Sequence, residues 1–394
     1  MQYTKQREDS FWSADPDGDD IQLVLNMLKS DFRTFGDALI SIMQNKLGTS
    51  VDNPIDCIQK CCNERNVPLS EIASSGTLRN WFAGKPRPKK SDENRNKMFA
   101  LAFALDLSID ETKDLFHKAY LDRAFNHRNY RELVYYFCIQ HGLPFSTAQA
   151  IISQINLSSQ STNDTTIFTR QIISDSDKLA KADDLIAYIH SHSHNFSVQY
   201  QTANVITMKL KAKALQYAQE YVKHLRTLAV SSSRQIKEDA QRELREYFHS
   251  VDITSDSFLY ATITGQRING DSRKTGTSTL PIASTELPKE IKNNFPQVKS
   301  LASGLDSFEE LRKVVILLFS YVFWHETRKN DIDLEDKYDQ YTSQLDSLLV
   351  DANLSPLYYG NPYDWLFMYC SAAQQSLDLF QEFLAEVLDP TDDI

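Results

Sequence analysis

Glycine and proline are scarce in this chain, and these two residues are the ones that end helices and build tight turns. Of 394 residues, 11 are glycine and 12 are proline, about 3% each against averages of about 7% and 5%. Apolar residues recur at helical spacing through long segments, as in residues 308–326 and 363–388. The sequence therefore predicts an all-α fold.

One polar stretch divides the predicted helices into two groups. It reads LSSQSTNDTT at Leu157–Thr166 and has turn chemistry throughout. We expect a polar N-terminal segment at 1–20, a helical domain at 21–156, a linker at 157–166 and a larger helical bundle at 167–394. In the first segment Asp15, Asp17 and Asp19 alternate as in a calcium loop, but the turn glycine and the bidentate glutamate are missing. Capping of a helix at Ile21–Ser30 is the preferred role.

A short amphipathic helix runs directly into a basic cluster at Thr77–Lys90, TLRNWFAGKPRPKK. In a helix, Leu78, Trp81 and Phe82 share one face because they are spaced i, i+3 and i+4. Gly84 then ends the helix, and the two prolines that follow favour an extended path. One face of this helix should pack against a core and leave the other exposed.

The polar face and the residues that follow it carry groups that contact nucleic acids. Thr77, Arg79 and Asn80 can pair with base edges in a major groove. Four cations come next with no acid among them, Lys85, Arg87, Lys89 and Lys90, and they can neutralise phosphates. The stretch predicts a site for double-stranded DNA, and its alternative is a buried helix followed by a solvated basic turn.

Two further helices are predicted directly after the basic cluster. Ser91 can cap a helix from Asp92 to Leu105, which carries an apolar stripe at 3.6-residue spacing. Ser108 and Glu111 form a capping-box signature for the next helix.

These residues together resemble the XRE (lambda-repressor-like) helix-turn-helix family. The resemblance lies in LRNWFAGKPRP followed by KMFALAFALDLSIDETKDLF, and it covers about residues 50–120. In that family a recognition helix ends in a tryptophan and a Gly-basic-Pro turn, and a Ser-capped helix closes the domain. The resemblance implies a helix-turn-helix domain in which Thr77, Arg79 and Asn80 contact bases.

The spacing before the recognition helix departs from the family pattern, because LSEIA at Leu69–Ala73 lies only three residues before Thr77. Either the turn is shortened, or the scaffold helix is Pro54–Asn66 and the third helix is longer and interrupted by Gly76. The second register is preferred. It predicts a trihelical core of Phe35–Leu47, Pro54–Asn66 and Ser70–Phe82.

The larger region carries a heptad-like seam, in which Leu215, Ala218, Val222, Leu225 and Ala229 repeat at 3-4 spacing and Met208 extends the register. A core helix in a bundle is preferred, and a helix that forms a homodimer is the alternative. The loop at Gly265–Leu280 is polar and should be exposed, with Arg267, Arg273 and Lys274 as secondary phosphate contacts.

Several classes of site are not indicated. Five cysteines without a CxxC pair predict neither disulfides nor zinc, and His190, His192 and His194 would share one side only in an extended segment. No nucleophile elbow or dinucleotide turn is present, so neither an enzyme nor a cofactor is expected.

The longest apolar run, Val314–Trp324, is too short to span a bilayer, and no signal sequence is seen. We expect a cytoplasmic protein without membrane contact.

The net charge of −11 argues against a chain covered by nucleic acid, but residues 51–130 carry 13 Lys/Arg against 11 Asp/Glu. The sequence thus predicts a DNA-binding transcriptional regulator whose C-terminal helices dimerise or sense a partner. The alternative is a protein-interaction scaffold, or an accessory protein of a mobile-element or anti-phage system, that uses the helix-turn-helix fold to bind protein.

Overall fold

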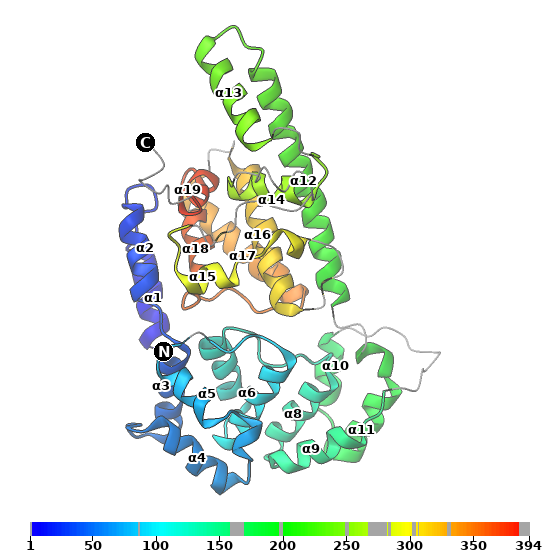
Figure 1. The fold of residues 1–394 in the computed structure, drawn as a ribbon. Coiled ribbons are helices and arrows are strands. Elements are labelled where there is room, and N and C mark those ends of the chain that lie inside the picture. The colour runs from blue at the N-terminus through cyan, green and yellow to red at the C-terminus, as the bar shows by residue number, and fades with distance from the viewer. Residues whose placement is uncertain are drawn as a thin grey trace. The chain divides into compact units, whose positions relative to one another are not determined.

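The computed structural model describes residues 2–85, 87–157, 169–196, 200–248, 252–266, 282, 285–301, 305, 307–328 and 332–385. Across these residues the regular secondary structure is helical (Figure 1), which confirms the predicted all-α fold class. The chain forms two compact units, which we call the middle unit (residues 33–202) and the terminal unit (residues 1–32 and 203–394).

The middle unit consists of short helices. They are α3 (Phe35–Leu47), α4 (Pro54–Arg65), the 3-10 turn η1 (Leu69–Glu71), α5 (Ser75–Phe82), α6 (Asp92–Ala104), α7 (Ile109–Asp114), the π-helical turn η2 (Leu115–Tyr120), α8 (Tyr130–Gln140), α9 (Phe145–Gln154), α10 (Thr169–Ser176), α11 (Ala182–Ser191) and the 3-10 turn η3 (Ser193–Phe196).

The terminal unit joins the two ends of the chain. It contains α1 (Gln2–Trp12), α2 (Ile21–Ser30), α12 (Gln201–Leu228, from residue 203), α13 (Arg234–Tyr247), α14 (Asp256–Thr264), α15 (Lys289–Asn294), the 3-10 turn η6 (Val298–Leu301), α16 (Phe308–Thr327), α17 (Leu334–Asp351), α18 (Pro362–Ser371) and α19 (Ser376–Phe383).

The compact units divide at residues 32 and 202, whereas the sequence places a domain at 21–156 and a bundle at 167–394. The predicted linker at 157–166 lies outside the described residues apart from Leu157, and so does the loop at Gly265–Leu280 beyond Gln266. Arg267, Arg273 and Lys274 belong to that undescribed part.

The N-terminal segment, predicted only to be polar, forms the helix α1, and acidic side chains after α1 contact α18 and the turn that follows it. The cap of α2 comes from this acidic segment, as predicted, but from Asp20 rather than Asp15, Asp17 or Asp19: Asp20 accepts a hydrogen bond from the backbone N–H of Gln22 at 2.8 Å. Asp17 accepts from the backbone N–H of Gln374 at 3.0 Å, and the hydroxyl of Tyr369 donates to Asp19 at 3.3 Å. These contacts explain why residues 1–32 belong to the same unit as the C-terminal helices.

The core of the middle unit brings α3 and α5 very close together. The rings of Phe35 and Trp81 meet edge to face, with centroids 5.0 Å apart. A Cβ at Gly36 would lie 2.4 Å from the carbonyl oxygen of Trp81, so this approach of the two backbones requires glycine. α3 and α4 match the first two helices of the predicted trihelical core to within one residue.

The most apolar helix, α16, forms the centre of the terminal unit. Every side chain from Leu311 to Trp324 is buried, which confirms the prediction of a buried helix. Arg312 lies inside this core because its guanidinium makes two hydrogen bonds with Asp364, of 2.8 and 2.7 Å. Within the described ranges, none of the helices has both the length and the apolar character that crossing a bilayer requires.

The single long helix predicted at Tyr363–Leu388 is wrong, because the chain breaks between α18 and α19. The buried ammonium of Lys337 donates to the carbonyl of Ala373 at 2.7 Å and to the Ser376 hydroxyl at 2.8 Å. A lysine from another helix thus satisfies polar groups that a continuous helix would pair within itself.

The seam predicted along α12 is partly correct. Ala218, Val222 and Leu225 are buried, but Met208 is 57% exposed and Leu215 is half-buried. The buried side of the helix continues through Ala214 and Thr207 instead. Met208 therefore does not extend the register.

Candidate nucleic-acid interface

α5 is a short helix with a defined start and end. The Ser74 side chain accepts a hydrogen bond from the backbone N–H of Thr77 at 3.2 Å and caps the first turn. At the other end Gly84 has φ +68°, and the N–H of Lys85 closes on the carbonyl of Asn80 at 3.2 Å. The helix is fixed at both ends by its own sequence.

The preferred register for the third helix is wrong in its first half. The expected helix at Ser70–Phe82 is divided into the 3-10 turn η1 and α5, with Ser74 as the cap between them. Gly76 lies inside the first turn of α5 and does not interrupt it. If α4 is not the scaffold helix of a helix-turn-helix, then the three-residue turn η1 occupies the position expected for that helix.

The two faces of α5 differ as the spacing predicts. Leu78 and Trp81 are buried, at 0% and 4% exposure, and Phe82 is half-buried. The predicted base-contacting residues Thr77, Arg79 and Asn80 are all exposed. These three side chains are therefore accessible to a ligand that lies along the helix.

Arg87 is placed differently from its neighbours in the basic cluster. Its guanidinium donates to the carbonyl of Ala119, at the end of η2, and to the carbonyl of Arg33, just before α3. These two bonds tie the segment after α5 to two distant parts of the middle unit. These bonds give Arg87 a structural role, and its expected phosphate contact stays a prediction.

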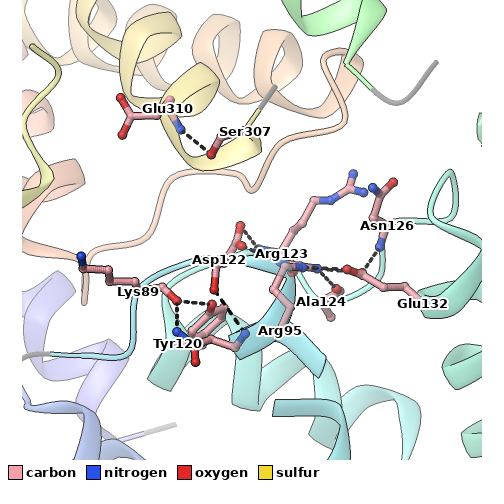
Figure 2. Close-up of polar contacts among 12 residues, drawn as sticks. Lys89, Arg95, Tyr120, Asp122, Arg123, Ala124, Asn126, Glu132, Ser307 and Glu310 are labelled. Atoms are coloured by element: carbon pink, nitrogen blue, oxygen red, sulfur yellow. Dashed lines mark hydrogen bonds and ion pairs between the residues drawn. The ribbon is translucent and has the colours of Figure 1, made fainter. Parts of the chain in front are cut away.

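Lys85 and Lys89 remain exposed, and in the described part of the chain neither ammonium group has an ion-pair partner. The backbone of Lys89 is anchored, since its carbonyl accepts from the Tyr120 hydroxyl at 2.9 Å (Figure 2). The same carbonyl also accepts from the Asn94 amide at 2.9 Å. Lys90 lies near the buried carboxylate of Asp122 and helps to lower its pKa. Two of the four predicted phosphate contacts are thus exposed cations on a fixed backbone.

A buried cluster of ion pairs around Arg95 lies next to the basic segment that follows α5. Arg95, on α6, makes two hydrogen bonds of 2.7 Å with Glu132 and a third bond with Asp122 (Figure 2). Burial acts to raise the pKa of Asp122, but the charges of Arg95, Lys90 and Arg123, together with a hydrogen bond from the backbone of Arg123, lower it on balance. Sequence spacing could not identify this cluster, because Asp122 and Glu132 are 27 and 37 residues away from Arg95.

A cavity of about 330 Å³ opens beside α5. The hydroxyls of Ser70, Ser74 and Thr77 line it together with Asn94 and Lys97 of α6. Lys97 is held by Glu93 on its own helix at 2.5 Å. Sequence inspection identified only Thr77 of these residues as a contact, although Ser74 carries a recognisable N-cap signal.

Charge around α5 is unusual for this acidic chain. Residues 72–91 contain five Lys/Arg and no Asp or Glu. The middle unit as a whole carries 19 Lys/Arg and 18 Asp/Glu, whereas the terminal unit carries 23 and 35. The positive potential is therefore local to α5 and the segment that follows it.

Among the residues that the structure describes, no three His, Cys, Asp or Glu side chains gather as a metal site, His190, His192 and His194 included. His192 packs on Tyr188 with ring centroids 4.5 Å apart, one turn earlier on α11. No family model, curated protein or solved structure matches this chain.

Proposed function

We propose that the middle unit binds double-stranded DNA through α5 and the segment that follows it, and that the protein is a transcriptional regulator. The observation that carries this proposal is that an exposed polar helix face is followed by exposed cations that have no ion-pair partner among the described residues. Arg79 lies on that face, and Lys85 and Lys89 follow it in a stretch without acids. The resemblance to the XRE family rests on the same residues.

The chemistry of the exposed face suits base contacts. Arginine makes bidentate hydrogen bonds to guanine, and asparagine makes them to adenine, at the major-groove edge. Arg79 and Asn80 carry these groups on the exposed side of a helix whose buried side is fixed by Leu78 and Trp81. A rigid helix of this kind presents its polar face at a defined angle.

Phosphate contacts would come from two sources beside the helix. Lys85 and Lys89 supply charge, and the cavity next to α5 supplies the hydroxyls of Ser74 and Thr77. Hydroxyls and lysines are among the common donors to DNA phosphates. The acidic terminal unit would repel DNA elsewhere and so restrict how a duplex can dock.

The acidity of the terminal unit also favours a second candidate function. A unit that contains 35 Asp/Glu against 23 Lys/Arg is better suited to a protein partner than to nucleic acid. In this alternative the helix-turn-helix-like fold binds a polypeptide through the same exposed face of α5.

Selection from a random duplex library distinguishes the two candidates. The wild-type protein should enrich a preferred sequence, and Arg79→Ala should flatten that preference because it removes a base contact. Lys178→Ala combined with Lys181→Ala, which removes two exposed cations elsewhere in the middle unit, serves as the control. Recovery of no preferred sequence by the wild type, with co-purification of a polypeptide at high salt, would support the protein-binding alternative.

A further inference from the structure

The terminal unit contains a second cavity, of about 420 Å³, that plays no part in the proposed DNA binding. Five helices line it: α12, α13, α14, α16 and α19. Its volume lies in the range of small-molecule sites, roughly 300–1,000 Å³. The lining is rich in charged and aromatic side chains, so its chemistry can be examined group by group.

The two arginines of the cavity already have partners. Arg242 pairs with Asp239 at 3.1 Å, and Arg328 pairs with Asp378 at 3.7 Å. Glu243 is the third carboxylate, and its recorded partner is the hydroxyl of Tyr221. Within the described residues no cation lies at ion-pair distance from Glu243, and the three carboxylates of the lining outnumber its two arginines by one.

Helix ends add to this negative character. α13 and α14 both finish at the cavity, and their C-terminal caps, Phe248 and Gly265, are part of its lining. The carbonyls at a helix C-terminus carry a partial negative charge. An anion would therefore meet the Glu243 carboxylate and the C-terminal end of α13, whereas the Gln381 amide already donates to the Thr262 and Ile263 carbonyls at the end of α14.

Aromatic rings form the wall beside Glu243. Tyr221 and Phe248 pack edge to face with centroids 6.4 Å apart, and Tyr321 and Leu377 also line the cavity. Burial raises the pKa of Tyr221, and its hydrogen bond to Glu243 raises it further. Tyr221 therefore stays neutral and keeps donating to the carboxylate.

We infer that this cavity binds an organic cation, with an ammonium or guanidinium group against Glu243 and an apolar body against the aromatic wall. Ring faces attract cations as well as apolar surface, so both parts of such a ligand are accommodated. The cation can belong to a free amine or to a lysine or arginine side chain of a polypeptide.

Isothermal titration calorimetry with three matched probes tests this inference on the full-length protein. The probes are phenethylamine, 2-phenylethanol and 3-phenylpropionate, which share a ring and differ in the charge of the head group. Phenethylamine should bind most tightly. Glu243→Gln should weaken its binding roughly 10-fold or more, since a charge-assisted hydrogen bond to a carboxylate becomes a weaker bond to a neutral amide.

Glu238→Gln is the matched control, because it removes the same charge from α13 at an exposed position outside the cavity. It should leave phenethylamine affinity unchanged. Tighter binding of the carboxylate probe, equal binding of all three, or no binding at all would overturn the inference, whether or not the variant folds. A blocked pentapeptide with one central arginine distinguishes a free amine from a polypeptide as the source of the cation. If the pentapeptide binds more tightly than phenethylamine, the natural ligand is a polypeptide.

Discussion

Arg87 shows how a side chain in the most basic stretch of the sequence can serve the fold. The sequence places it among phosphate contacts because its neighbours are Lys85, Lys89 and Lys90. Its partners are carbonyls 32 and 54 residues away, which no local pattern contains. The exposure of Arg79, in contrast, follows from helical spacing alone, and the sequence predicts it correctly.

Replacement of Arg87 should therefore affect stability more than DNA binding. Arg87→Ala removes two hydrogen bonds from a cationic donor to carbonyls, and we expect a loss of roughly 1–3 kcal/mol in the free energy of unfolding. Urea unfolding measures it, with Lys85→Ala as the control, expected to change stability by at most about 0.5 kcal/mol. Equal stability of the two variants would contradict the structural role of Arg87.

The buried cluster around Arg95 leads to a prediction with a definite pH dependence. In the wild type the pKa of Asp122 is lowered, so its contribution to stability is present at neutral pH and is lost only below about pH 4. Arg95→Leu leaves two buried carboxylates without their cation and should cost roughly 3–5 kcal/mol at neutral pH.

The pH dependence of this variant should be opposite in sign. Burial is the largest influence on the pKa of Asp122, and without Arg95 only Lys90 and Arg123 oppose it. We therefore expect the pKa to rise, so that the folded state takes up a proton more readily than the unfolded state. The variant should gain stability as the pH falls from 7 to 5, as measured by urea unfolding at each pH. A parallel profile for variant and wild type would show that the ion pair does not control Asp122.

At the scale of helices, helix starts that carry a local capping signal were predicted well, but breaks within predicted helices were not. The Ser91 cap of α6 and the capping box of Ser108 and Glu111 are confirmed, because each involves residues within three positions. The break after α18 could not be predicted, because Lys337 of α17 stabilises it from 36 residues away. The helix predicted at Ser70–Phe82 is interrupted after η1, and the local sequence signal for this interruption is Ser74, which caps α5.

The contact between α3 and α5 can be tested with two glycines. Gly36→Ala places a methyl group 2.4 Å from the Trp81 carbonyl oxygen and should cost roughly 1–3 kcal/mol by overpacking. It should also displace α5 and weaken DNA binding. Thermal unfolding and anisotropy with duplex DNA measure the two effects.

Gly76 provides the matched substitution within α5. A Cβ there has the Ser74 hydroxyl oxygen as its nearest neighbour, at 3.8 Å, so alanine fits without strain. Gly76→Ala should stabilise the protein by roughly 0.5–1 kcal/mol, because alanine favours helix more than glycine does. If the two variants behave alike, the close packing of α3 on α5 is not what constrains position 36.

At the scale of the whole molecule, the all-α fold class follows from the sequence, whereas the two compact units also depend on contacts between distant residues. Helical periodicity is a local property, so an all-α chain is predictable from it. The assignment of residues 1–32 to the unit of residues 203–394 depends on contacts such as Asp17 with Gln374, 357 residues apart. The exposed face of α5 was predictable, and the fixed backbone beneath Lys89 was not.

Salt dependence of DNA binding tests the central proposal most directly. Fluorescence anisotropy with a mixed-sequence duplex gives the slope of log K against log salt concentration for the wild type and for Lys85→Ala combined with Lys89→Ala. Loss of two phosphate contacts should reduce the magnitude of the slope by roughly 2, while Lys178→Ala combined with Lys181→Ala leaves it unchanged. Absence of binding at low salt, or an unchanged slope in the first variant, would contradict DNA binding through α5 and its basic segment.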